Sequence, residues 1–209
     1  VGGTGDAGGW TVDLSSTYGR DEHEIFLHNS FNRDLYIDTS TATTNGFSPS
    51  DFRAGNFIGS QWTTNLDLRH EFDVGLASPL TLALGAEYRK DTYEIVAGDD
   101  ASRYKSGSQS YPGFSVTGAG YHARDSKAVY ANVAVEPITS LQVDAALRYE
   151  DFSDFGDTTV AKLTARYDFN DAFAIRGTVS SGFRAPTLAE SFYSATNVSP
   201  TSAFVQLPP

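Results

Sequence analysis

The stretch LQVDAALRYE, residues 141–150, alternates apolar and polar side chains along its whole length. Its odd positions hold Leu141, Val143, Ala145, Leu147 and Tyr149. Its even positions hold Gln142, Asp144, Ala146, Arg148 and Glu150. Because successive side chains of a β-strand point to opposite faces, this period of two predicts a strand with one apolar face and one mostly polar face.

The same alternation recurs along most of the chain, and no segment shows a convincing helical period. The further predicted strands cover residues 10–18, 62–72, 80–91, 129–136, 159–169 and 173–180. An eighth strand is a possibility within residues 21–60, for example Glu24–His28, and the Gly-rich start VGGTGDAGG is expected to be a flexible lead-in. The sequence therefore predicts an all-β, antiparallel fold of about seven or eight strands.

The predicted connections alternate between short and long. The short ones are residues 73–79, 137–140 and 170–171. The connections at the other end include two long ones, 21–60 and 98–125, and a compact one at 152–157. Short turns at one end and long loops at the other are typical of a transmembrane β-barrel, with the short turns on the periplasmic side.

Aromatic side chains fall at two levels of the apolar faces. The expected periplasmic level holds Trp10, Phe72, Phe169 and Phe173. The expected outer level holds Tyr18, Trp62, Tyr88, Tyr149 and Phe183. The ten residues from Trp62 to Phe72 would rise roughly 25 Å in a tilted strand, which matches the apolar band of a barrel. A soluble β-sandwich, whose strands also often end in aromatic residues, stays an alternative.

The polar faces carry charges of both signs. In a barrel these nine would point into the lumen: Asp67, Arg69, Glu87, Arg89, Asp144, Arg148, Lys162, Arg166 and Arg176. Charges of mixed sign on neighbouring strands can pair with one another. The same Arg or Lys on the lipid side would cost about 2–4 kcal/mol at the midplane of the bilayer.

Composition excludes several classes of function. The net charge of -11 argues against a nucleic-acid partner, and the absence of Cys excludes disulfides and thiolate chemistry. No nucleophile elbow, zinc-protease or phosphate-loop spacing occurs, so no catalytic residue and no cofactor are expected. Because the 209 residues include no Met, we expect a processed chain or an internal segment of a longer one.

The stretch SGFRAPTLAESF, residues 181–192, resembles a motif of TonB-dependent outer-membrane receptors, in which a strand ends in Gly-Phe-Arg-Ala-Pro and a surface loop begins with Thr-Leu-X-Glu. The matching positions are Gly182, Phe183, Arg184, Ala185, Pro186, Leu188 and Glu190. Three earlier stretches resemble the same barrels: RYEDFSDFG at 148–156, LASPL with GAEYR within 76–89, and GWTVDLS with YGR within 9–20. The four matches are in order and cover nearly the whole chain.

The resemblance implies that residues 1–209 are part of a barrel of about 22 strands. An open sheet edge in lipid leaves backbone groups unpaired, so seven strands could not span a membrane alone. The family's plug domain and TonB box are expected outside this chain, and the end at Pro208-Pro209 is expected within an outer loop.

The function implied by the resemblance is energy-coupled uptake of a scarce solute across the bacterial outer membrane. The implied partners are outer-membrane lipid, a small-molecule ligand on the extracellular side, and the TonB complex through other parts of the protein. Siderophore, oligosaccharide and cobalamin remain open as ligand classes. Two alternatives stay beside this one: a small self-contained structural or adhesive barrel, and a soluble β-sandwich binding module.

The loop 98–125 is the best candidate for ligand contact. Its aromatic and basic residues among Gly and Ser are Arg103, Tyr104, Tyr111, Phe114, Tyr121 and His122. Such rings stack on a sugar or an aromatic siderophore, and Arg103 and Lys105 would attract an anionic chelate. Mobile outer loops are also generally rich in Tyr and Gly, which leaves a purely structural interpretation open.

Two groups of carboxylates, in 99–100 and 151–157, have the oxygen-rich chemistry of a calcium site. Compact turns favour Asp for local hydrogen bonds, however, and we expect that role and no metal site.

Overall fold

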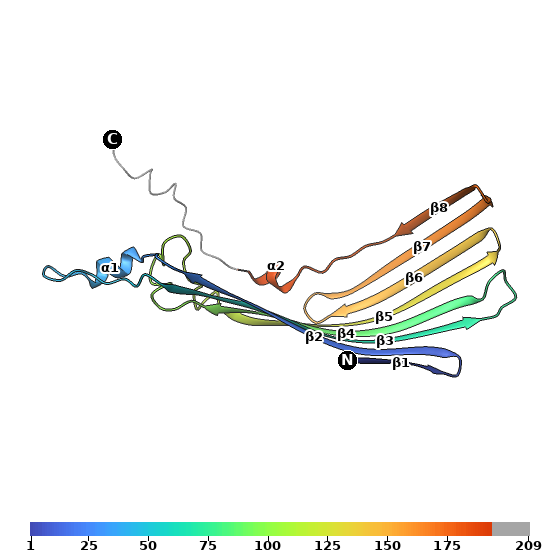
Figure 1. Ribbon diagram of the computed structural model, residues 1–209, viewed down its shortest axis with the longest axis horizontal. Coiled ribbons are helices and arrows are strands. Elements are labelled where there is room, and N and C mark those ends of the chain that lie inside the picture. Colours follow the sequence, from blue (N-terminus) through green and yellow to red (C-terminus); the bar gives the residue numbers. More distant parts are fainter. Residues whose placement is uncertain (194–209) are drawn as a thin grey trace. The chain divides into compact units, whose positions relative to one another are not determined.

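The computed structural model describes residues 1–193 and consists mainly of strands (Figure 1). The strands are β1 (Gly2–Ala7), β2 (Trp10–Leu27), β3 (Phe52–Phe72), β4 (Leu80–Ala97), β5 (Gly120–Ile138), β6 (Leu141–Phe152), β7 (Gly156–Asn170) and β8 (Phe173–Ser180). The helices are α1 (Arg33–Thr39) and α2 (Leu188–Phe192). The expected outer loop that ends at Pro208-Pro209 lies outside the described residues.

The eight strands form one sheet in chain order, β1 to β8, which confirms the predicted all-β antiparallel fold. The register also confirms the predicted faces. Ala145 of β6 lies opposite Leu163 of β7, which lies opposite Val179 of β8. Apolar positions therefore align with apolar positions across three strands, and the polar positions between them form the other face.

The apolar face is not covered by protein within the described part of the chain. Leu147, Leu163 and Val179 are 52%, 48% and 68% exposed. A soluble β-sandwich would bury such residues between two sheets, and residues 1–193 form a single sheet. The β-sandwich alternative is therefore wrong.

Two further expectations from the sequence are also wrong. The Gly-rich start is not a flexible lead-in but contains β1, which pairs with β2 from Gly2 opposite Ser15 to Ala7 opposite Trp10. Glu24–His28 is not a separate strand, because β2 continues through residues 24–27. Gly and charged residues have low intrinsic strand propensity. In both segments, hydrogen bonding to the neighbouring strand outweighs that low propensity.

A tight turn explains how β1 is recruited to the sheet. Gly8 and Gly9 join β1 to β2 with φ angles of +59° and +85°. Two consecutive residues with positive φ suit a two-residue hairpin turn, because its twist matches the twist of the flanking strands. The remaining connections at this end cover 73–79, 139–140 and 171–172, while 28–51, 98–119 and 153–155 join strands at the other end.

The expectation that no segment is helical is wrong for two short segments. Asn32 caps α1 by accepting a hydrogen bond from the Leu35 N–H, and Thr187 and Glu190 form a capping box on α2. These caps stabilise helices too short to show a periodic pattern in the sequence. Within residues 1–193, no helix combines the length and apolar character needed to cross a membrane.

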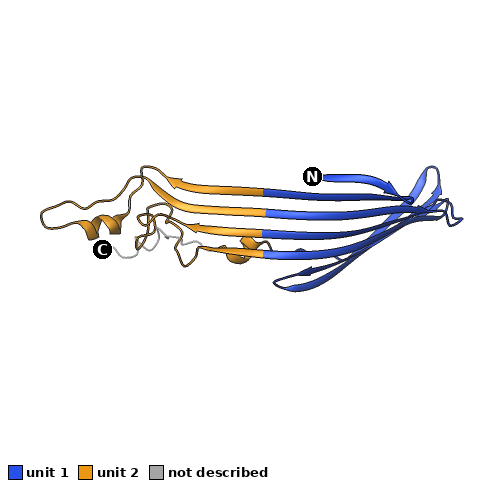
Figure 2. Cartoon of the chain, turned by 90° about the horizontal axis from the view of Figure 1, so that it is seen from below, with its two compact units in different colours: residues 1–19, 61–91, 124–186 blue, residues 20–60, 92–123, 187–209 orange. Residues whose placement is uncertain are grey.

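The chain divides into two compact units, which are coloured separately in Figure 2. Unit 1 comprises residues 1–19, 61–91 and 124–186. Unit 2 comprises residues 20–60, 92–123 and 187–209. The polar sheet face described below belongs to unit 1, and the two long loops belong to unit 2.

In unit 1 the aromatic residues predicted at two levels meet in small clusters. At one level His70 packs against Trp10 and Phe72, with ring centroids 5.0 Å and 4.4 Å away. Phe169 lies 5.4 Å from Phe173 at the same end of the strands. At the other level the rings of Trp62 and Tyr88 meet edge to face at 6.1 Å. His70 therefore lies within an aromatic cluster near the end of β3.

Candidate functional site

The polar face of unit 1 is held together by ion pairs that reach over a whole strand. Arg148 on β6 lies 3.0 Å from Glu87 on β4, and Arg89 on β4 lies 3.0 Å from Glu150 on β6. The intervening strand β5 presents the small, buried Ala128 opposite Glu150. Because Ala128 is small, it leaves room above β5 for the Arg89–Glu150 pair, whereas the Arg148 guanidinium lies over the Tyr130 ring of β5, 5.6 Å from its centroid.

A second contact across the same face passes over a glycine. The Tyr130 hydroxyl of β5 donates a hydrogen bond to the Asp67 carboxylate of β3, across β4. A Cβ atom on Gly85 of β4 would lie 2.1 Å from the Tyr130 ring. Gly85, part of the GAEYR stretch, is therefore the residue that lets the tyrosine cross over β4.

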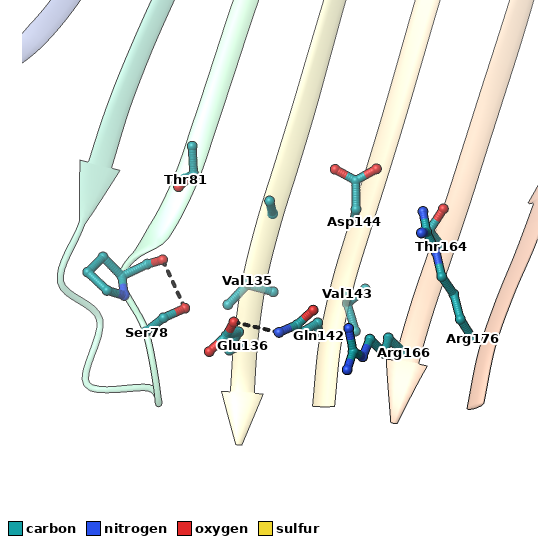
Figure 3. Close-up of a pocket in the computed structure, with 12 residues that line it drawn as sticks. Ser78, Thr81, Val135, Glu136, Gln142, Val143, Asp144, Thr164, Arg166 and Arg176 are labelled. Atoms are coloured by element: carbon teal, nitrogen blue, oxygen red, sulfur yellow. Dashed lines mark hydrogen bonds between the residues drawn. The ribbon is translucent and has the colours of Figure 1, made fainter. Parts of the chain in front are cut away.

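Nearer the short turns the polar face is hollowed (Figure 3). The hollow has a volume of about 410 Å³ and is lined by Ser78, Thr81, Glu136, Gln142, Asp144, Thr164, Arg166 and Arg176 among others. Gln142 donates a hydrogen bond of 3.0 Å to Glu136, and Asp144 lies 3.6 Å from the Lys162 ammonium group. Arg166 is paired with Asp168 at 2.7 Å, and Arg176 lies opposite Arg166 in the ladder.

The nine charged residues predicted for this face thus fall into three groups. Asp67, Glu87, Arg89 and Arg148 belong to the network around β5. Asp144, Arg166 and Arg176 line the hollow, and Lys162 is grouped with them because it pairs with Asp144. Arg69 belongs to neither group and pairs along its own strand with Glu71 at 2.9 Å.

The motif stretch 181–192 follows β8 rather than ending it, because the strand stops at Ser180. Phe183 packs against Phe155, with ring centroids 5.8 Å apart. The Pro186 carbonyl accepts a hydrogen bond of 2.6 Å from Arg124, whose guanidinium group also lies 2.7 Å from Asp154. The predicted Thr-Leu-X-Glu element begins helix α2, whose Leu188 is buried.

In unit 2 two long loops are joined by hydrogen bonds. We call residues 28–51 the α1 loop and residues 98–119 the tyrosine loop. Asn32 of the α1 loop is completely buried, and its side-chain amide donates to the carbonyls of Ala101 and Tyr104 at 2.8 Å and 3.0 Å. The Tyr104 hydroxyl donates to Asp38 at 3.0 Å. Asp38 also pairs with the Lys105 ammonium group.

The surroundings of the two loops favour the charged forms of Asp38 and Lys105 and the neutral form of Tyr111. The hydrogen bonds from Lys105 and Tyr104 lower the pKa of Asp38 below its ordinary value of 3.8. The hydrogen bond with Asp38 raises the pKa of Lys105 above 10.5. Burial raises the pKa of Tyr111 to about 12, so its hydroxyl stays protonated at neutral pH.

The six predicted ligand residues do not converge on one point. The tyrosine loop is shorter than predicted, so Tyr121 and His122 lie on β5, where Tyr121 is 60% exposed and His122 stacks on Phe192 at 3.8 Å. Phe114 is only 4% exposed and packs against Phe57 and Tyr111 at 4.7 Å and 5.9 Å. Phe114 therefore supports the loop from within and offers no ring surface to a ligand.

The two remaining residues, Arg103 and Tyr104, are adjacent at the loop surface. Arg103 pairs with Asp100 and donates a hydrogen bond of 3.3 Å to the Gly98 carbonyl. Tyr104 is 37% exposed. Both groups are thus oriented by neighbours within the two loops, and part of the Tyr104 ring is free to meet a ligand.

The Asp99 carboxylate of the tyrosine loop accepts backbone hydrogen bonds, one of them within its own turn, as the turn chemistry predicts. Asp99 accepts hydrogen bonds from the Ser102 N–H at 2.6 Å and from the Arg53 N–H at 2.9 Å. Among residues 1–193 no group of three or more metal-ligating side chains is arranged to hold a metal ion.

Two important residues were not singled out by the sequence. Asn32 had a signal, because Asn two residues before Asp34 fits a helix start. Arg124 had none, because its partners Asp154 and Pro186 lie 30 and 62 residues further along the chain.

Comparison with known proteins identifies the family of this chain. The family model of TonB-dependent receptor-like β-barrels matches residues 2–209. No curated protein matches the sequence. Among solved structures the chain is similar to the siderophore receptor PirA from Acinetobacter baumannii, with 18% identity and a TM-score of 0.60 over 88% of this chain and 24% of that one.

It is also similar to a mutant of the ferric enterobactin receptor PfeA from Pseudomonas aeruginosa, with 14% identity and a TM-score of 0.62 over 88% of this chain and 24% of that one. At these identities the likeness shows the fold alone. The chain thus spans about a quarter of the length of either receptor. From the family match over residues 2–209, the chain belongs to the TonB-dependent receptor β-barrels, a family of outer-membrane receptors that are not enzymes.

Proposed function

We propose that this chain forms part of the wall of a TonB-dependent receptor that takes up a scarce solute across the bacterial outer membrane. The observation that carries the proposal is the family match over residues 2–209. Energy for uptake would come from the TonB complex, which would act on other parts of the protein. Siderophores, oligosaccharides and cobalamins are the candidate ligand classes.

The two faces of the sheet support a wall between lipid and water. Leu147 and Arg148 are neighbours on β6, yet Leu147 belongs to the exposed apolar face and Arg148 to the charged network. Lipid would cover the apolar face, since exposed apolar surface in water is unfavourable. The charged face would then line the lumen, where Asp67, Arg69, Glu87, Arg89, Asp144, Lys162, Arg166 and Arg176 join Arg148.

The edges of the sheet support a larger barrel. Among residues 1–193, β1 and β8 are each hydrogen-bonded to another strand on one side only. In a bilayer each unpaired backbone group costs several kcal/mol, so both edges need strands to pair with. Further strands of the same receptor would supply those partners, and residues 1–209 would form one section of the barrel.

The exposed ring of Tyr104 and the neighbouring Arg103 are the proposed ligand contacts of the tyrosine loop, with Tyr121 as a further exposed ring. Tyr111 and Phe114 would support the loop from behind. His122 is occupied by its stack on Phe192 and would have a supporting role.

The mass of the native polypeptide tests this proposal. Outer-membrane fractions would be blotted with an antibody raised against residues 98–119. We expect a band several-fold heavier than the 22.5 kDa of this chain. A band at that mass in the outer membrane would instead indicate a small self-contained barrel, and the receptor proposal would fail.

A further inference from the structure

The α1 loop and the tyrosine loop are connected through the interior of unit 2, at Asn32. Its amide nitrogen donates to the carbonyls of Ala101 and Tyr104, and its amide oxygen accepts from Leu35 at 3.0 Å. Its backbone N–H donates to the Ser48 hydroxyl at 2.8 Å. One buried side chain therefore caps α1 and satisfies two carbonyl groups of the neighbouring loop.

Further hydrogen bonds run along the same contact. The Ser30 hydroxyl donates to the Gln109 carbonyl at 2.8 Å, and the Gln109 N–H donates to the Phe31 carbonyl at 2.9 Å. Asp34 accepts hydrogen bonds from the backbone N–H and the hydroxyl of Ser106. The contact thus extends from Ser30 to Asp38 on the α1 loop and involves both backbone and side-chain groups.

Tyr104 is held at both ends by this contact. Asn32 binds its carbonyl group, and Asp38 accepts from its hydroxyl. We propose that Asn32 is a positioning residue for Tyr104 and that the α1 loop and the tyrosine loop move as one body. The ligand part of this inference rests on the proposed uptake function, whereas the single-body part does not.

Asparagine suits this position because both ends of its amide are used. Aspartate would still cap α1, since its carboxylate accepts the Leu35 N–H. It has no amide hydrogen, however, and would place a charged oxygen against the carbonyls of Ala101 and Tyr104. Asn32→Asp therefore separates the contact between the loops from the capping of the helix.

Cross-linking tests the single-body part, and the chain has no Cys that would interfere. Asp34→Cys and Ser106→Cys would be introduced together into the full-length receptor in intact cells, because these two side chains touch. We expect a disulfide to form readily. Asn32→Asp should slow its formation about tenfold, the effect of losing two hydrogen bonds.

Asn45→Asp is the matched control, because Asn45 is an exposed residue of the same α1 loop. It should leave the rate of disulfide formation unchanged. A rate that changes less than about twofold in Asn32→Asp would overturn the single-body inference. The same inference fails if the cysteine pair does not cross-link in the receptor that keeps Asn32.

Uptake tests the positioning of Tyr104. The probes are labelled ferric enterobactin, maltoheptaose and cyanocobalamin, one for each candidate class. For a probe that the unaltered receptor takes up, Asn32→Asp should raise the half-saturating concentration about tenfold, with a smaller change in maximal rate. Oxidising the cysteine pair should leave uptake intact, because loops that already move together lose nothing when joined.

The outcomes separate the two proposals. If the unaltered receptor takes up none of the probes, the proposed uptake function loses its support, while cross-linking still decides the single-body inference. If Asn32→Asp slows cross-linking but leaves the half-saturating concentration unchanged, the positioning role is wrong. Uptake that stops on oxidation and returns on reduction would show that the loops must separate, which also overturns the inference.

Discussion

The polar face of unit 1 and the loop pair of unit 2 both rely on polar side chains, but these bind different groups. On the sheet face, side chains bind side chains, as in the Arg148–Glu87 and Arg89–Glu150 pairs. In the loop pair, side chains also bind backbone groups, as Asn32 binds two carbonyls and Asp99 binds two N–H groups.

The backbone explains the difference. In a sheet the ladder already satisfies the backbone donors and acceptors, so side chains remain free to neutralise one another. A loop has no ladder, and its buried backbone groups need side-chain partners. Substitutions on the sheet face should therefore alter charge balance, whereas substitutions inside the loop pair should alter local structure.

The largest effect that we expect is in the loop pair, from Phe114→Ala. Phe114 is 4% exposed and packs against Phe57, so its loss should destabilise the tyrosine loop by about 3–5 kcal/mol. Hydrogen exchange of residues 98–119 in the folded receptor measures this effect. Val116→Ala is the control, because Val116 is 60% exposed. Equal exchange in both variants would contradict the proposed supporting role of Phe114.

The next effect compares the two faces of one strand. Leu147→Arg should cost about 2–4 kcal/mol at the lipid face and strongly impair assembly in the outer membrane. Arg148→Leu should be milder, at about 1 kcal/mol, because Arg89 remains beside Glu150 and Glu87. The fraction of folded barrel, read from its altered gel mobility before heating, gives both values. Equal assembly of the two variants would mean that the lipid-face assignment is wrong.

A smaller effect is expected at Gly85, because the Tyr130 ring lies where a side chain of that residue would be. Gly85→Ala would place a methyl group 2.1 Å from the Tyr130 ring and displace its hydroxyl from Asp67, at about 1–3 kcal/mol. Gly177→Ala is the matched control, since nothing lies within 4 Å of its added Cβ atom. Urea unfolding of the two variants should differ, and similar midpoints would contradict the crossing of Tyr130 over β4.

The smallest effect is the response of the loop pair to pH. Hydrogen bonding lowers the pKa of Asp34 and Asp38 below 3.8, so their contribution persists above that pH and is lost as the pH falls through the lowered values. The raised pKa of Lys105 means that its contribution is lost only as the pH rises beyond 10.5.

The distance between the two loops should therefore stay constant from about pH 5 to pH 9, between the ordinary carboxyl and lysine values. Spin labels attached at Thr43→Cys and Val116→Cys, both exposed, report this distance without requiring a disulfide between the loops. A transition inside that window would show that other groups control the contact between the loops.

The sequence alone determined seven of the strands, their two faces and the family. A period of two appears in residues 141–150 whatever surrounds them, because the pleat of a strand imposes it. Local rules also predicted that Asp99 would serve a turn, since its partners include the nearby Ser102. The stretch GFRAP is likewise visible without any knowledge of its contacts.

Only the tertiary structure decided which residues meet over long separations. Gly2–Ala7 became a strand because β2 lies beside it, although its Gly-rich composition favours a flexible segment. Tyr130 reaches Asp67, 63 residues away, because Gly85 leaves room on the strand between them. Asn32 binds the Tyr104 carbonyl 72 residues further on. Such contacts depend on which strands become neighbours, and a local pattern of side chains carries no information about that.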